Sequence, residues 1–164
     1  MSGESSILYF TMIYAVLNTK SGLLSYCCAG HPPLVWFRER QGTAELVGHD
    51  NFVVGAFEDV DYQSSMIQLE PGDKVWFYSD GVTEADDGIN QFSESGLCTT
   101  IETLKEHPTQ QQSALVVESV QNWRQSKSFE DDVSLLVAEW KGFIEGEDQC
   151  DMRLVKKETV QFFK

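Results

Sequence analysis

Acidic side chains stand beside two apolar segments, at positions where strands are expected to end or begin. Asp80 directly follows residues 74–79, and Asp131 and Asp132 directly precede residues 133–140. If the two segments are antiparallel strands of one sheet, the end of one lies beside the start of the other, and the carboxylates crowd one rim. Crowded carboxylates repel one another and favour a cation between them, and oxygen ligands suit Mg²⁺ or Mn²⁺. The alternative, which the spacing alone favours, is that these acids are solvated turn residues.

The charge balance narrows the classes of partner. The 164 residues include 12 Lys and Arg against 26 Asp and Glu, a net charge of −14. Nucleic acids and anionic membranes attract proteins through clustered Lys and Arg, so we expect neither as a partner. No apolar run approaches the ~20 residues of a membrane helix. The first residues also lack the basic start and apolar stretch of a signal peptide, so we expect a cytoplasmic protein.

The four cysteines, at positions 27, 28, 98 and 150, do not show the CxxC spacing of a zinc or redox site. We therefore interpret them as reduced thiols that pack as small hydrophobic side chains.

The first half of the chain reads as a series of strands. Two turns interrupt the strands. One is expected at Asn18 to Gly22, and the other at Glu70-Pro71-Gly72-Asp73, which has the residues of a type II turn. The second turn predicts a hairpin between the strands on either side of it. Gly42, Gly48 and Gly55 mark a turn-rich stretch without a strand. The expected strands cover residues 7–17, 23–29, 34–38, 60–69 and 74–79, with a last one at 133–140.

Two helices are expected between residues 97 and 123. Their apolar residues recur at helical spacing, and Thr109 with Gln112 has the spacing of a capping box at the start of the second helix. The two apolar stripes are Leu97, Ile101 and Leu104, and Val116, Val120 and Trp123.

The fold class follows from strands that are apolar on both faces. In residues 133–140 one face of the expected strand carries Val133, Leu135 and Val137, and the other carries Leu136, Ala138 and Trp140. Residues 74–79 are also apolar on both faces, with Val75 and Phe77 on one and Trp76 and Tyr78 on the other. A strand of this kind must be covered on both faces. Together with antiparallel pairing, this predicts an α+β fold in which two packed sheets lie between helices, an α-β-β-α sandwich.

The end of the chain differs from the rest. We expect a domain over residues 1–140 and, over 141–164, an acidic linker with a C-terminal extension. Residues 152–163 are apolar again, and their periodicity fits a strand or a helix.

Three motifs in order make the chain similar to a known family. They are AGHPP at 29–33, GDKVWFYSDGVTE at 72–84 and DDVSLLV at 131–137. Together they resemble the SpoIIE/RsbU branch of the PPM family, the metal-dependent, protein phosphatase 2C-like serine/threonine phosphatases. The resemblance covers residues 7 to about 139 and implies an α-β-β-α sandwich with two Mg²⁺ or Mn²⁺ ions in an acidic cleft. A metal-bound water would there attack the phosphorus of phosphoserine or phosphothreonine.

The resemblance also implies roles for individual residues. The metal-binding positions of the family are matched by Asp80, with Gly81 of the Asp-Gly motif, and by Asp131. Asp132 is a further candidate. His31 falls near the metals, so it is a candidate for handling protons at the edge of the site. The alternative is a loop histidine that hydrogen bonds to the backbone.

The chain departs from the family pattern at its start. Family members begin with a strand that ends in a metal-bridging Gly-Asp, followed by two helices, and no Gly-Asp precedes residue 70 here. The chain therefore looks like the C-terminal part of a phosphatase domain, with impaired activity. The face left uncovered is expected to pair with a second copy in a homodimer or to be covered by residues 152–163.

The family context suggests the partner. The expected substrate is a phosphorylated regulatory protein of the anti-anti-sigma, STAS type, in bacterial signalling behind a sensor or receiver domain. The alternative is a non-catalytic, degenerate module that binds a sigma-factor regulator or an adaptor.

Overall fold

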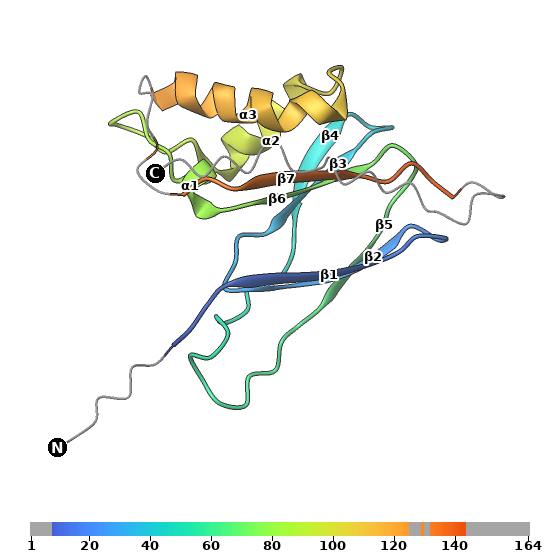
Figure 1. Ribbon diagram of the computed structural model, residues 1–164, viewed down its shortest axis with the longest axis vertical. Coiled ribbons are helices and arrows are strands. Elements are labelled where there is room, and N and C mark those ends of the chain that lie inside the picture. The colour runs from blue at the N-terminus through green and yellow to red at the C-terminus, as the bar shows by residue number, and fades with distance from the viewer. Residues whose placement is uncertain (1–7, 125–128, 130–131, 144–164) are drawn as a thin grey trace.

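Two antiparallel sheets form the body of the molecule (Figure 1). The computed structural model describes residues 8–124, 129 and 132–143. The first sheet has the order β1-β2-β5, with β1 at Met12–Asn18, β2 at Leu23–Ala29 and β5 at Ser65–Gln68. The second has the order β4-β3-β6-β7, with β4 at Thr43–Val47, β3 at Leu34–Arg38, β6 at Lys74–Tyr78 and β7 at Leu135–Glu139.

Helices cover one face of this pair of sheets. The helices are α1 (Asp80–Thr83), α2 (Ser93–Thr103) and α3 (Thr109–Arg124). Figure 1 shows α2 and α3 over the outer face of the second sheet, and no helix of the described residues over the outer face of the first. The sequence predicted part of an α-β-β-α sandwich, and this prediction is confirmed. The described residues form two antiparallel sheets with a layer of helices on one side. None of the helices in the described part has the length and hydropathy needed to cross a bilayer.

Alternation along β6 builds two separate cores. Trp76 and Tyr78 point to the helical layer and pack with Leu97 and Val116, and burial raises the pKa of Tyr78. Val75 lies in the other core, between the sheets, where it packs with residues of β2 such as Leu24. The prediction that this strand is covered on both faces is therefore correct.

The described cysteines belong to these cores or to their edges. Cys27, Cys28 and Cys98 are free thiols, and Cys28 is buried between the sheets. Burial raises the pKa of Cys28, and burial together with Glu102 and Glu94 raises the pKa of Cys98 to about 11. These two thiols therefore stay protonated at neutral pH, in agreement with a packing role, and Cys150 lies outside the described residues.

The predicted hairpin at residues 70–73 is wrong. The turn itself forms, with the Asp73 N–H donating to the Glu70 carbonyl at 2.9 Å, but β5 pairs with β2 while β6 pairs with β3 and β7. The turn therefore crosses from one sheet to the other, because β6 can bury both apolar faces only inside the second sheet. A further strand, β4, lies in the stretch interpreted as turns, and β5 is shorter than the strand predicted at 60–69.

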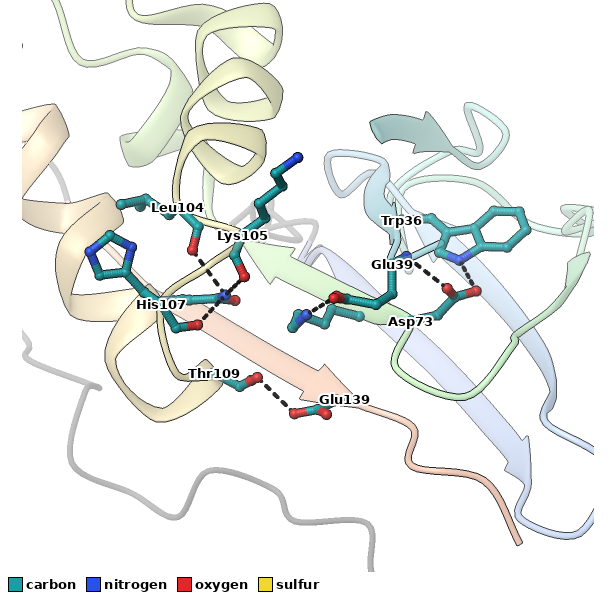
Figure 2. A network of polar contacts seen from close by, with 10 residues as sticks. Trp36, Glu39, Asp73, Leu104, Lys105, His107, Thr109 and Glu139 are labelled. Carbon is teal, nitrogen blue, oxygen red and sulfur yellow. Dashed lines mark hydrogen bonds and ion pairs between the residues drawn. The ribbon is translucent and has the colours of Figure 1, made fainter. Parts of the chain in front are cut away.

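The expected capping box at the start of α3 is not formed. The Thr109 hydroxyl instead donates to the Glu139 carboxylate on β7 at 2.7 Å (Figure 2). The buried side-chain amide of Gln112 donates to the carbonyls of Leu104 and His107, at 3.1 and 2.8 Å. These side chains therefore fasten the loop between the helices and attach α3 to the second sheet.

A buried carboxylate, Asp73, joins three segments at one end of the molecule. It is 2% exposed and accepts hydrogen bonds from the Trp36 indole N–H and from the backbone N–H groups of Glu39 and Glu70, each at 3.0 Å. Figure 2 shows the contacts with Trp36 and Glu39. Its backbone also bonds Trp140, since the Trp140 N–H donates to the Asp73 carbonyl at 3.0 Å. Asp73 thus holds the β3–β4 turn and the crossing between the sheets through its side chain, and the end of β7 through its backbone.

We predict that Asp73→Ala destabilises the fold by about 3 kcal/mol, because it leaves three donors without their acceptor in a buried place. Chemical denaturation measures this loss. Asp50→Ala, at an exposed aspartate, is the control and should change the free energy of unfolding by less than about 0.5 kcal/mol. Equal effects of the two substitutions would contradict the role given to Asp73.

Candidate functional site

The end of β6 and the start of β7 lie side by side, as the sequence analysis expected. The strands pair with Tyr78 opposite Leu135, and Ser79 continues the contact. The Ser79 N–H donates to the Ser134 carbonyl at 3.0 Å, and its hydroxyl donates to the Asp132 carbonyl at 2.9 Å. Ser79 also accepts the Ser134 N–H at 2.8 Å. The residue before Asp80 therefore fixes the backbone around Asp132.

Asp80 begins the short helix α1 at this rim, and its side chain is exposed. One carboxylate oxygen accepts the N–H of Gly81 at 3.0 Å. The Asp80 carbonyl accepts the Glu84 N–H at 2.8 Å, which closes the helical turn. A carboxylate held by its own turn and open to solvent is available to a cation or another ligand.

Gly81 lets the two segments approach closely. A Cβ built on Gly81 would lie 2.8 Å from the Asp132 carbonyl oxygen, closer than real Cβ contacts allow. The glycine is buried under this carbonyl. Its missing side chain therefore sets the spacing between Asp80 and the segment that precedes β7.

His31 lies at the same rim, on the connection from β2 to β3. In the β3–β6 pairing Val35 lies opposite Trp76, so the start of β3, which His31 precedes, lies toward the Tyr78 end of β6. The partly buried imidazole donates from Nδ1 to the Pro32 carbonyl at 3.2 Å, since a carbonyl can only accept. The backbone hydrogen bond of the loop interpretation is thus present, and it leaves Nε2 for other contacts.

The described donors at this rim do not complete a cation site. Among the described residues, no group of three or more His, Cys, Asp or Glu side chains is arranged to hold a metal ion. Asp80 and Asp132 are described there, whereas Asp131 lies outside the described residues. A hard cation takes about six oxygen ligands, so the described carboxylates can supply only part of its coordination.

The neighbouring acids serve their own loop instead. The Asp86 carboxylate accepts the Gly88 N–H, and Asp87 accepts those of Ile89 and Asn90. The hydrogen bonds to Asp87 lower the pKa of its carboxyl. These hydrogen bonds hold residues 86–90 in a turn.

Two polar residues that shape the rim were missed by the sequence analysis. Ser79 is one, and its position directly before Asp80 was an available signal. The other is Asn51, whose amide group donates to the Cys28 and Gln63 carbonyls, each at 3.0 Å, and whose carbonyl accepts the Gln63 N–H. Its backbone carbonyl accepts the N–H of Gly30, next to His31. No spacing in the sequence pointed to this contact across 21 residues.

Several known proteins are similar to this chain in sequence. The relatives include the phosphoserine phosphatase RsbP of Bacillus subtilis (strain 168), 26% identical over 141 residues, which are 84% of this chain and 32% of RsbP. The phosphoserine phosphatase RsbU of the same organism is 34% identical over 77 residues, 47% of this chain and 23% of RsbU. The chain thus spans about a third or less of the length of these relatives.

Solved structures show the same fold. The PP2C phosphatase domain of SpoIIE from Bacillus subtilis, solved with a fragment of its regulatory domain, has a TM-score of 0.73 at 20% identity. That match covers 88% of this chain and 42% of the other. The RsbU and RsbW domains of Rv1364c from Mycobacterium tuberculosis give 0.70 at 23% identity, covering 82% and 37%.

The family assignment rests on the sequence. The sequence model of the family "Stage II sporulation protein E (SpoIIE)" matches residues 1–141, most of the chain. With the motifs, the fold and the relatives in agreement, the chain belongs to the SpoIIE family, and its fold is that of the PP2C phosphatase domain of SpoIIE.

Proposed function

We propose that this chain is part of a metal-dependent phosphatase that removes phosphate from phosphoserine or phosphothreonine on a regulatory protein. The observation that carries the proposal is the rim shared by three neighbouring strands. There β6 and β7 bring Ser79, the residue before Asp80, into contact with the backbone of Asp132, and the connection that carries His31 leads into β3, the other neighbour of β6. Two relatives of the chain are named phosphoserine phosphatases, which supports the same chemistry.

In this proposal Asp80, Gly81, Asp131 and Asp132 hold Mg²⁺ or Mn²⁺. A bound metal would supply a nucleophilic water and offset the negative charge of the phosphoryl group. The exposed carboxylate of Asp80 and the close approach at Gly81 suit this role. One SpoIIE phosphatase structure, of 20% identity to this chain, comes from Mn-presoaked material, which makes manganese a reasonable probe.

His31 has the hydrogen-bonding pattern of a proton donor or acceptor. Because Nδ1 is engaged with the Pro32 carbonyl, a proton gained or lost in a reaction would be carried at Nε2. When a phosphate ester is hydrolysed, the leaving serine or threonine oxygen needs a proton. We assign this transfer to His31, which precedes β3 at the end of that strand nearer Tyr78 of β6.

We further propose a phosphorylated regulator of the anti-anti-sigma, STAS type as the substrate. The competing proposal is a non-catalytic module that binds such a regulator or an adaptor. It is favoured by the incomplete set of metal donors among the described residues. The coding sequence directly upstream of Met1 separates the two, since a strand ending in Gly-Asp and followed by two helices would support the enzyme.

The first prediction for the site concerns metal binding. A calorimetric titration with Mn²⁺ should show weak binding. Asp80→Asn should reduce the affinity at least tenfold, because one charged ligand is lost. Glu84→Gln removes the same charge from an exposed residue four positions further on and should leave the affinity unchanged. Binding that is insensitive to Asp80→Asn, or equally sensitive to both variants, would refute the assignment of Asp80.

The second prediction concerns turnover. The chain alone, with Mn²⁺, should hydrolyse p-nitrophenyl phosphate slowly or not at all, because a two-metal mechanism needs the bridging carboxylate that it lacks. The measurement is the rate of p-nitrophenol release for the wild type and for Asp80→Asn. Rapid turnover that Asp80→Asn abolishes would show that the chain is a competent enzyme by itself.

The third prediction concerns Gly81. The added methyl group of Gly81→Ala meets the Asp132 carbonyl, so the two segments must separate, at a cost of about 1–3 kcal/mol in stability. The affinity for Mn²⁺ should fall as well. The control is Gly96→Ala inside α2, where the new methyl has ordinary contacts with Phe92 and helix propensity should add up to about 1 kcal/mol of stability. If Gly81→Ala changes stability and Mn²⁺ affinity no more than the control does, neither property depends on the close approach of Gly81 to the Asp132 carbonyl.

A further inference from the structure

The connection that carries His31 packs against a long loop from a later part of the chain. Residues 48–64, all of them described, join β4 to β5 and form neither a helix nor a strand. Loops of this length are uncommon in compact domains and usually have a function. Val54 and Phe10 exchange two backbone hydrogen bonds, at 3.0 and 2.9 Å. This bridge attaches the middle of the loop to the segment that precedes β1.

The side chain of Asn51 attaches the same loop to the first sheet. β2 pairs with β5 only as far as Tyr26, so the last three residues of β2 lie beyond this pairing. There the Asn51 Nδ2 donates to the carbonyls of Cys28 and Gln63, each at 3.0 Å, and its Oδ1 accepts the Gln63 N–H at 2.9 Å. The amide group thus bonds both backbone groups of Gln63, as a neighbouring strand would.

The backbone beside His31 is held by the same part of the loop. The Asn51 carbonyl accepts the Gly30 N–H at 2.9 Å. Gly30 has a φ of +60°, which favours glycine, and a Cβ built on it would lie 2.2 Å from Cγ1 of Val53. A hydrogen bond and close packing therefore fix the residue that precedes His31.

The backbone conformation at this place determines how the imidazole is held. Nδ1 of His31 donates to the carbonyl of Pro32, the next residue, at 3.2 Å. A contact between adjacent residues depends on the dihedral angles that separate them, so it requires a defined backbone. With its proton on Nδ1, the neutral ring carries an acceptor lone pair on Nε2. The orientation of the ring and its tautomer are therefore coupled to the segment that Asn51 holds.

We propose that Asn51 is a positioning residue that sets the orientation and the tautomer of His31. The proton transfer at this ring belongs to the proposed function, on which this role of Asn51 rests. Asparagine suits the place because its short side chain carries both donors and an acceptor. An aspartate would instead face the two carbonyls of Cys28 and Gln63 with a carboxylate. Loop 48–64 and the His31 connection then act as one unit.

The test is nitrogen NMR of the imidazole rings in the full chain, because nitrogen chemical shifts distinguish the two neutral tautomers. The buffer is at about pH 9, above the ordinary pKa of histidine. His31→Gln assigns the His31 signal, and hydrogen exchange near neutral pH follows the Gly30 amide in the same proteins.

Three variants are compared with the wild type. Asn51→Ala removes the amide group, and Asn51→Asp keeps its shape but removes its donors. The matched control is Asn18→Ala. The Asn18 side chain accepts the N–H groups of Lys20 and Ser21 in the β1–β2 turn, at the other end of β2. The control therefore also removes side-chain hydrogen bonds to a loop backbone, but far from His31.

We expect His31 to hold its proton on Nδ1 in the wild type and in Asn18→Ala, and to lose this single tautomer in both Asn51 variants. The exchange rate of the Gly30 amide should rise at least tenfold in these two variants, while the His107 signal stays unchanged. Asn51→Asp carries the test if Asn51→Ala does not fold.

Three results would overturn the role of Asn51. They are a wild-type His31 protonated on Nε2, a His31 signal that is the same in all four proteins, and an equal loss of the tautomer in Asn18→Ala. A wild-type chain that does not bind Mn²⁺ would contradict the proposed function, but it would leave these readouts unaffected, so the two proposals can fail separately.

Discussion

The burial of β6 on both faces is the constraint on which the rest of the structure depends. The strand carries Trp76 and Tyr78 on one face and Val75 on the other. Both faces can be buried only if the strand lies inside a sheet that is covered on both of its faces. This requirement places β6 between β3 and β7 and separates it from β5, its predecessor in the chain. It also brings the end of β6 beside the start of β7, and so creates the rim where Asp80 lies.

The features that could be predicted were those that a short window of sequence contains. The two-sided apolar pattern predicted the packed sheets, and the spacing of Leu97 and Ile101 predicted α2. The motif around Asp80 gave the family and the place of the candidate site. Because these signals depend on local periodicity or on a few adjacent residues, they are present before the chain folds.

The features that were missed depend on contacts between distant segments. The Glu70–Asp73 turn has the residues of a hairpin, and only the pairing of β6 with β3 shows that it crosses between sheets. Thr109 and Gln112 have capping-box spacing, but Glu139 and the carbonyls of the preceding loop are better partners in the folded chain. In the site, the contact of Gly81 with the Asp132 carbonyl likewise joins residues about 50 positions apart.

The two ends of β6 are stabilised in different ways, and this difference bears on function. At the Lys74 end, Asp73 is buried and fully engaged by three N–H donors, so that end needs no ligand. At the Tyr78 end, Ser79 joins the strands through backbone and hydroxyl groups, while the carboxylate of Asp80 stays exposed. In the proposed function Asp131 and Asp132 lie beside Asp80, where their carboxylates would repel one another unless a cation lay among them. In the proposed function, a cation that binds Asp80 and the segment before β7 would add its binding free energy to the β6–β7 pairing, so that metal binding and the order of the rim would be linked.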